Sequence, residues 1–286
     1  MNSVIFHISK PFSVFIPVYN EEAILTANTE RLISYLDRYG VDYEIIIGSN
    51  GSQDGTPELG RMLSDTYIRV RFFHLKEKGV GNAFKRGIGI ARYDAVVSLD
   101  MDLSINLSFI GEALEFLEAG QDIVIGSKKA GDERRSPLRR LGSDLFILTA
   151  GVLLGLPFED YSIGAKAYRR DLVLEYNRMI DAGTSYVLNI VYLAFRDKRK
   201  VIEIPVQCED YRESRFHIIS EGLYRFRQPF RLAPYNGPCP GVSKHFPGKE
   251  RPMRAHDQQF FGWKGFRQFN EILDLQIRAL PPVQRG

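Results

Sequence analysis

Short apolar runs alternate with helix-like stretches through the first half of the chain, and this alternation constrains the fold more than any other feature. We expect strands at 12–17, 43–47, 68–75 and 95–99, because each is a short run rich in β-branched or aromatic residues. The stretches between them have helical periodicity. This pattern is typical of an α/β fold with a Rossmann-like, doubly wound, mostly parallel sheet flanked by helices.

Helix-start and helix-end residues support these assignments. We expect Asn20 to cap the first helix and Gly40 to end it, Pro57 to open the second and Asn106 to cap the fourth. Since right-handed crossovers bring the carboxyl ends of parallel strands to one edge of a sheet, the loops that follow the strands should converge there.

The second half of the chain has weaker signals. We expect strands at 122–126 and 201–206, an extended segment at 160–168, and helices at 141–156, 172–179, 187–195 and 216–226. From Pro229 onward, frequent prolines interrupt any regular element. The predicted organisation is therefore an α/β domain at 1–228 and a Pro/Gly-rich extension at 229–286, either disordered or docked peripherally.

Composition narrows the class of protein. The 286-residue chain is 44% hydrophobic and 26% charged, as in ordinary soluble domains, and its net charge of +3 is too small to indicate nucleic-acid binding. Cys208 and Cys239 form no disulfide framework, and no leader peptide is expected. The longest uncharged apolar stretch, Phe146–Phe158, is shorter than the ~20 residues of a membrane span. We expect a cytoplasmic protein, peripheral at the cytoplasmic face of a membrane.

Two carboxylates, Asp100 and Asp102, follow the apolar run 95–99. Because open α/β sheets bind ligands beyond the carboxyl ends of their strands, this pair suits one divalent cation shared with substrate phosphates. Taken alone, the same pattern also fits a strand end that turns into solvent.

Several motifs, in order along the chain, resemble those of glycosyltransferase family 2, whose fold is GT-A. They are Ser13–Glu22, Ser49–Thr56 and Asp100–Asp102. Further motifs resemble the dolichyl-phosphate mannose synthase branch of polyprenyl-phosphate glycosyltransferases: Ile125–Ser127, Leu138–Ser143, Asp160–Gly164, Tyr168–Arg170, Glu203–Val206 and Glu213–Arg215. The resemblance runs from roughly residue 12 to 227.

This resemblance implies an inverting, metal-dependent transfer of a mannose- or glucose-type hexose from a GDP- or UDP-sugar to a polyprenyl or dolichyl phosphate. It implies Mg²⁺ or Mn²⁺ bound by Asp100 and Asp102. The residues expected to bind the nucleotide sugar are Pro17, Tyr19, Glu21, Asn50, Asp54, Asp100 and Lys128. Those expected to bind the acceptor phosphate are Arg139, Ser143 and Arg215, and those expected to act in catalysis are Asp102, Asp160 and Arg139.

The chain departs from the branch at five of these motif positions. Ser49 and Asn50 replace acidic residues, Ser104 replaces a Gln, Lys128 replaces an Arg, and Arg215 replaces a Lys. An amide can bind a base or ribose but has no charge, and Lys holds phosphate without the bidentate geometry of Arg. These changes leave the nucleotide base and the sugar open.

Alternative interpretations remain for individual residues and for the whole chain. Asn50 and Asp54 also fit loop and cap positions, and the basic segment 128–140 also fits a solvated face. Asp160 fits either a positioning role, with a phosphate acceptor, or a general base, with a hydroxyl acceptor. The alternative functions are a family 2 transferase that uses a sugar hydroxyl in polysaccharide or glycan assembly, and a catalytically silent nucleotide-binding homologue.

Overall fold

The computed structural model describes residues 6, 8–127, 137–158, 160–161, 163–207, 229 and 232, with side chains from residue 146 onward in the helix that begins at 137. These residues belong to the first of two units of the chain, Met1–Pro240; the second, Gly241–Gly286, lies outside the described ranges. The helix predicted at 216–226 also lies outside them. The predicted domain boundary and C-terminal extension therefore remain predictions.

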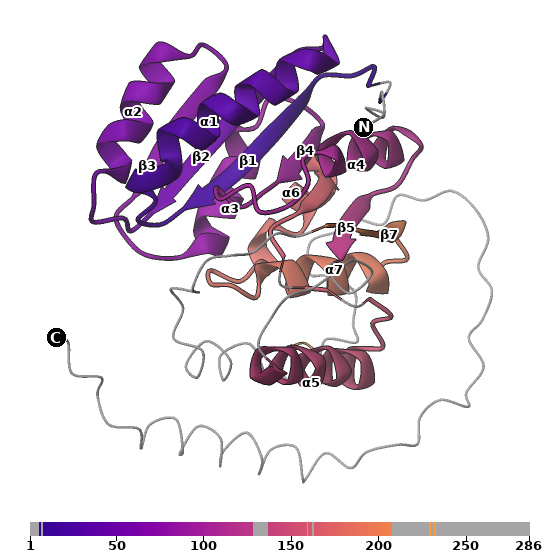
Figure 1. The fold of residues 1–286 in the computed structure, drawn as a ribbon. Helices are drawn as coiled ribbons and strands as arrows, with labels where there is room; N and C mark the ends of the chain where they lie inside the picture. The colour runs from indigo at the N-terminus through magenta and orange to yellow at the C-terminus, as the bar shows by residue number, and fades with distance from the viewer. Residues whose placement is uncertain are drawn as a thin grey trace, which may run out of the picture. The chain divides into compact units, whose positions relative to one another are not determined.

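Strands and helices alternate as the sequence indicates (Figure 1). In chain order the elements are β1 (Phe12–Val18), α1 (Glu22–Leu36), η1 (Asp37–Tyr39), β2 (Tyr43–Asn50), α2 (Thr56–Thr66), β3 (Val70–Leu75), α3 (Val80–Ile90), β4 (Ala95–Ser98), α4 (Ser108–Glu118), β5 (Ile123–Ser127), α5 (Pro137–Leu154), β6 (Lys166–Arg169), α6 (Arg170–Glu175), η2 (Asn177–Met179), α7 (Tyr186–Arg196) and β7 (Val201–Pro205).

Within the described part of the chain, the strands form one seven-stranded sheet in the order β3-β2-β1-β4-β6-β5-β7. β1 pairs in parallel with β2 and β4, β2 with β3, and β5 with β7. β6 runs antiparallel to both of its neighbours, β4 and β5. The predicted α/β class with a mostly parallel sheet is confirmed, with β6 as its antiparallel strand among the described residues. Of the extended segment predicted at 160–168, only the end is strand.

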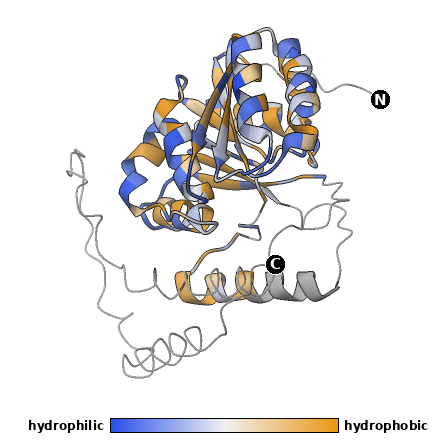
Figure 2. Ribbon diagram, turned by 90° about the vertical axis from the view of Figure 1, so that its left-hand side faces the viewer, coloured by the Kyte–Doolittle hydropathy of each residue, from blue (hydrophilic) through white to orange (hydrophobic). Residues whose placement is uncertain are grey.

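Helices cover both faces of the sheet. Along β1, Val14 and Ile16 contact a cluster that includes buried residues of α1, α2 and α4, whereas Phe15 contacts a cluster that includes α3, α6 and α7. Side chains of a strand point alternately to opposite faces, so one continuous apolar run supplies both layers. α5 contributes Ala150 and Leu154 to the second cluster, and its described half is hydrophobic in Figure 2. No helix in the described ranges is long and apolar enough to cross a membrane.

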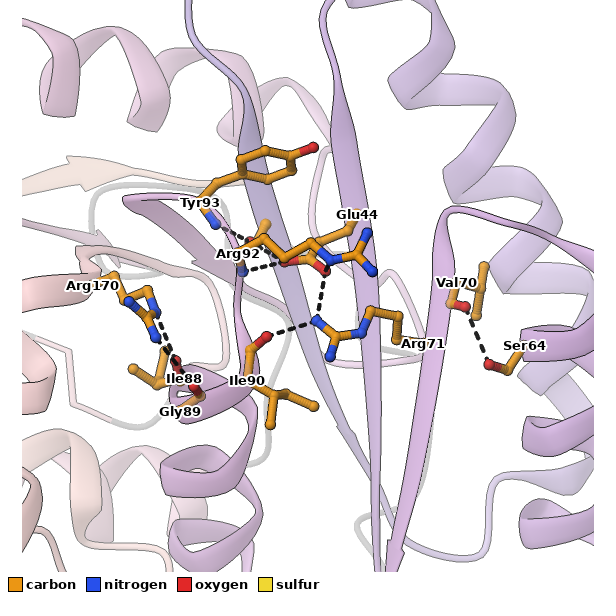
Figure 3. Close-up of polar contacts among 11 residues, drawn as sticks. Glu44, Ser64, Val70, Arg71, Ile88, Gly89, Ile90, Arg92, Tyr93 and Arg170 are labelled. Carbon is orange, nitrogen blue, oxygen red and sulfur yellow. Dashed lines mark hydrogen bonds and ion pairs between the residues drawn. The ribbon is translucent and has the colours of Figure 1, made fainter.

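A buried carboxylate ties the amino ends of the central strands together (Figure 3). Glu44, which is 2% exposed, accepts hydrogen bonds from Ser13 Oγ at 2.8 Å and from the Arg92 backbone N–H at 2.6 Å. Arg71 donates to Glu44 at 3.0 Å and to the Ile90 carbonyl at 2.6 Å. A buried charge is tolerated only when it is paired and hydrogen-bonded, as here. This network fixes the sheet at the end opposite to the carboxyl ends of β1 and β2.

Candidate active site

The carboxyl ends of β2, β1 and β4 lie side by side, because these strands are neighbours in that order. Pro17 pairs with Gly48, and Val18 pairs with Ser49. On the other side of β1, the Leu99 N–H donates to the Phe15 carbonyl at 3.1 Å. The loop with Tyr19, the end of β2 at Asn50 and the turn with the Asp100–Asp102 pair therefore lie at one edge of the sheet, as right-handed crossovers predict.

The loops after β1 and β2 are joined by reciprocal hydrogen bonds. Asn20 Oδ1 accepts from the Gln53 N–H at 2.8 Å, and the Asn20 N–H donates to Ser52 Oγ at 3.1 Å. The Glu21 N–H donates to Thr56 Oγ1 at 2.8 Å. The prediction that Asn20 caps α1 is wrong: its φ is +53°, in the left-handed region, and its amide binds the neighbouring loop instead. Glu21, on the candidate nucleotide side, is thus held by the start of α2.

The Asp54 carboxylate binds the starts of two helices. Its carboxylate accepts from the Thr56 N–H at 3.0 Å and from the Glu22 N–H at 3.3 Å, in the first turns of α2 and α1. Burial would raise the pKa of Asp54, but hydrogen bonds from the Thr56 hydroxyl and from backbone N–H groups outweigh it and lower that pKa below its usual value. The N-cap residue of α2 is Gly55, and Asp54, one residue earlier, forms the Asx turn that the sequence also allows, while its contact with a nucleotide remains a prediction.

Asn50, at the end of β2, uses its amide to join the end of β1 and the loop before α3. Its Nδ2 donates to the Val18 carbonyl at 2.9 Å, and its Oδ1 accepts from the Gly79 N–H at 3.2 Å. The side chain is only 4% exposed. A carboxylate at this position could accept from Gly79 but could not donate to Val18. The amide that replaces an acid at this position is therefore matched to its surroundings.

Ser49, the other departure in this motif, belongs to a chain of hydrogen-bonded polar side chains. Ser49 Oγ donates to Ser52 Oγ at 3.0 Å and lies 3.0 Å from His74 Nδ1. Ser49 is fully buried, so its hydroxyl depends on these partners rather than on water. The Ser49 hydroxyl is thus satisfied by side chains of its own motif and of β3.

Tyr19 follows directly after the last residue of β1, at the edge of the sheet where the candidate site lies. It is half-buried, as is Pro17 two residues earlier. Lys78 Nζ lies 3.9 Å from the centre of the Tyr19 ring, within range of a cation–π contact. Sequence reasoning missed Lys78, because the polar and glycine-bearing segment 76–81 indicates only a loop between β3 and α3.

The acidic pair lies on a turn whose apolar residues are anchored in the core. Leu99, Met101 and Leu103 are all buried, whereas Asp100 is exposed and Asp102 half-buried. Asp102 Oδ1 accepts from the Ser104 N–H at 3.1 Å. Alternation with buried neighbours thus turns both carboxylates away from the core.

These carboxylates fit a divalent cation that also binds substrate. Mg²⁺ and Mn²⁺ prefer oxygen ligands, and Mg²⁺ is commonly held by one or two carboxylates together with substrate phosphates. In the ranges that the structure describes, no group of three or more His, Cys, Asp or Glu side chains could hold a metal ion. A site built on Asp100 and Asp102 therefore needs further ligands, such as the oxygens of a diphosphate.

A turn before β6 fixes Asp100 from the other side. The Gly164 N–H donates to Asp100 Oδ2 at 3.2 Å, and a Cβ at Gly164 would lie 2.6 Å from the same oxygen. Within this turn, Asp160 Oδ1 accepts from the Ile163 N–H at 3.1 Å, and Lys166 Nζ donates to the Ile163 carbonyl. Asp160 and Lys166 are 6% and 1% exposed. The turn thus brings a backbone donor to Asp100, and a Cβ at Gly164 would displace the Asp100 carboxylate.

The basic residues predicted around the acceptor cannot be placed in full. Arg139 and Ser143 fall in α5, but their side chains lie outside the described residues. Lys128, which follows Ser127 at the end of β5, and Arg215 also lie outside them. Their roles remain predictions.

Known proteins resemble this chain in sequence and in fold. The sequence model of Glycosyl transferase family 2 matches residues 13–176. The chain is 33% identical to an undecaprenyl-phosphate 4-deoxy-4-formamido-L-arabinose transferase of Pectobacterium atrosepticum over 199 residues, which cover 69% of this chain and 59% of that protein. It is 32% identical to a dolichol-phosphate mannosyltransferase of Pyrococcus furiosus over 200 residues, covering 68% and 55%. The chain thus spans little more than half the length of these relatives.

A solved structure with a similar fold is glucosyl-3-phosphoglycerate synthase from Mycobacterium tuberculosis, in complex with Mn²⁺, UDP-glucose and phosphoglyceric acid. The TM-score is 0.55 at 19% identity, and the match covers 78% of each chain. At this identity the likeness supports the fold alone, and it confirms the predicted GT-A architecture.

Proposed function

Since the chain belongs to glycosyl transferase family 2 and is a glycosyltransferase, we propose that it transfers a hexose from GDP- or UDP-hexose to a polyprenyl phosphate, with inversion and with a divalent metal. The observation that carries the proposal is the meeting of three strand ends at one edge: Asn50 ends β2, Tyr19 follows β1, and the Asp100–Asp102 turn follows β4. Distant relatives named as undecaprenyl- and dolichol-phosphate sugar transferases support the choice of acceptor.

The nucleoside binds at the ends of β1 and β2 in this proposal. Pro17, Tyr19 and Glu21 line one side, and Asn50 lies behind them. Because the two loops are cross-linked through Asn20 and Thr56, the wall is formed before the ligand arrives. Preorganisation of this kind reduces the entropy lost on binding.

Asp100 and Asp102 hold the metal next to the donor diphosphate. A bound metal would supply positive charge that offsets the negative charge developing on the leaving nucleoside diphosphate. The N–H groups of Gly164 and Ser104 keep one oxygen of each carboxylate oriented. Lys128, directly after β5, is proposed to contact the same diphosphate.

The acceptor phosphate is already an anion, so its oxygen attacks the anomeric carbon without a general base. One C–O bond forms as the bond to the diphosphate breaks, and the configuration inverts. Arg139, Ser143 and Arg215 are proposed to bind the acceptor phosphate, with the two arginines positioning it for in-line attack. Asp160 then acts by holding the turn that ends at Gly164, a role supported by its burial and its bond to the Ile163 N–H.

A lipid acceptor places the reaction at a membrane surface. Leu148 and Val152, one turn apart on α5, are 61% and 74% exposed, while Ala150 and Leu154 on the same helix are buried. An apolar outer face on a helix favours contact with lipid. We propose that the protein is peripheral at the cytoplasmic face, as the sequence predicts.

The test incubates the purified protein with Mg²⁺ or Mn²⁺, a panel of GDP- and UDP-hexoses, and either a polyprenyl phosphate or a sugar-hydroxyl acceptor. The proposal predicts a glycolipid product that requires the metal. If only the hydroxyl acceptor is glycosylated, the assignment of the acceptor is wrong. Nucleotide binding without metal dependence or turnover would instead indicate a silent homologue.

A further inference from the structure

The main chain of Lys78 is fixed against the end of β2. Gly51, with φ +74°, lies so close that a Cβ on it would be 2.8 Å from the Lys78 nitrogen and 2.9 Å from its Cα. The next residue, Gly79, donates its N–H to Asn50 Oδ1 at 3.2 Å. Lys78 therefore leaves the loop from a defined position beside the candidate nucleoside site.

The loop of Lys78 is also supported from behind. The N–H groups of Gly81 and Asn82, at the start of α3, donate to the Ala182 carbonyl at 2.9 and 3.2 Å. A Cβ at Gly81 would meet the backbone carbon of Ala182 at 2.8 Å. Backbone contacts on both sides therefore hold the loop from which the Lys78 side chain extends.

That side chain is exposed, and its ammonium covers the ring of Tyr19 at 3.9 Å from the centre. A ring face on the rim of a nucleotide site is the surface on which a base would stack. Lysine carries its charge on a flexible stem of four carbons and pairs with phosphate as a point charge. The Lys78 ammonium can thus contact the Tyr19 ring and can also pair with an anion bound beside that ring.

We propose that Lys78 is a specificity-determining residue of the donor site. Its ammonium covers the Tyr19 ring until a nucleoside diphosphate binds there and displaces it. The diphosphate then forms an ion pair with the displaced ammonium. The proposal rests on the function proposed above and adds a preference of the site for nucleoside diphosphates over nucleosides. A nucleoside without phosphates must displace the ammonium and gains no ion pair in return. A nucleoside diphosphate also displaces the ammonium, but its diphosphate then forms an ion pair with that ammonium. Lys78 therefore opposes the first ligand and favours the second.

The experiment is calorimetric titration of the full-length protein with UDP, GDP, uridine and guanosine. Lys78→Met keeps the apolar stem and removes the charge, and Lys76→Met is the matched control, because Lys76 is an exposed lysine of the same loop. We expect Lys78→Met to weaken binding of the preferred diphosphate about tenfold and to leave binding of its nucleoside unchanged or stronger. Lys76→Met should match the wild type, and Lys78→Arg should restore diphosphate binding.

Two results would overturn the inference. One is equal affinity of the wild type and Lys78→Met for the diphosphate; the other is an equal loss for diphosphate and nucleoside, which would make Lys78 a support for Tyr19 only. In both cases the wild type still binds nucleotide, so the proposed function survives. Failure of the wild type to bind UDP or GDP would overturn both proposals together.

Discussion

Replacement of Gly164 by Ala tests how the turn before β6 controls the acidic pair. An added Cβ would lie 2.5 Å from Asp100 Cγ and 2.6 Å from Oδ2, well below ordinary van der Waals contact. The carboxylate must move by roughly 0.5–1 Å to relieve this overlap, and the move weakens the 3.2 Å bond from the Gly164 N–H. Asp100 is exposed, so it can rotate into water rather than unfold the turn.

The expected result is a large loss of activity with a small loss of stability. A misplacement of about 1 Å at a catalytic group can lower a rate about 10²-fold, whereas overpacking at a site with an exposed neighbour should cost about 1 kcal/mol of unfolding free energy. We expect Gly164→Ala to lower kcat about 100-fold and to raise the metal concentration needed for half activity. Release of nucleoside diphosphate, followed at increasing Mn²⁺ concentration, measures both effects.

The control is Gly89→Ala, on α3, where an added Cβ meets no atom within 4 Å. It should leave activity unchanged and raise stability by up to about 1 kcal/mol through helix propensity. A folded Gly164→Ala protein with wild-type turnover and the same metal requirement would refute the reasoning.

Three further substitutions test separate parts of the site. With a phosphate acceptor, Asp160→Asn keeps a hydrogen-bond acceptor and should retain activity within about tenfold, whereas loss of a general base would cost 10²–10⁴-fold in an initial-rate assay. Asp54→Ala should lower the unfolding free energy at pH 7 by about 1 kcal/mol. Because folding lowers the Asp54 pKa, the contribution of its carboxylate is complete above the ordinary Asp value and is lost as the pH falls through the folded value. Thermal unfolding should show a smaller stability difference between the wild type and Asp54→Ala at pH 3 than at pH 7. An equal difference at both pH values would contradict the stabilising role of the Asp54 carboxylate. Asn50→Asp removes the donor to Val18 and buries a charge, so urea unfolding should show an unfolding free energy lower by about 1–3 kcal/mol. Wild-type stability would contradict the role of the Asn50 amide in joining β1 to the loop before α3.

The sequence predicted the first four strands because their signals are local. Apolar runs of strand length, Pro57 at a helix start and Gly40 in the left-handed region at φ +68° each act within a few residues. The convergence of the strand ends followed from the handedness of the crossovers alone. The acidic pair was found in the same way, because it ends an apolar run.

Features that depend on distant partners could not be predicted in this way. Asn20 has the residue type of a helix cap, but its amide oxygen accepts a hydrogen bond from the Gln53 N–H, 33 positions away in the loop after β2. β6 is short, and its place between β4 and β5 depends on pairing with strands far away in sequence. The bond from Gly164 to Asp100 joins residues 64 positions apart. Local patterns contain no information on such contacts.

The most direct measurement is the affinity for UDP or GDP with and without Mn²⁺, in the wild type and in Asp102→Asn. Asparagine keeps an oxygen for the Ser104 N–H and removes only the charge, and Asp65→Asn, an exposed position on α2, is the control. We predict that Mn²⁺ tightens nucleotide binding about tenfold or more in the wild type and in Asp65→Asn, and that Asp102→Asn loses this gain while its metal-free affinity stays the same. An undiminished gain in Asp102→Asn would show that the acidic pair does not hold the metal beside the diphosphate.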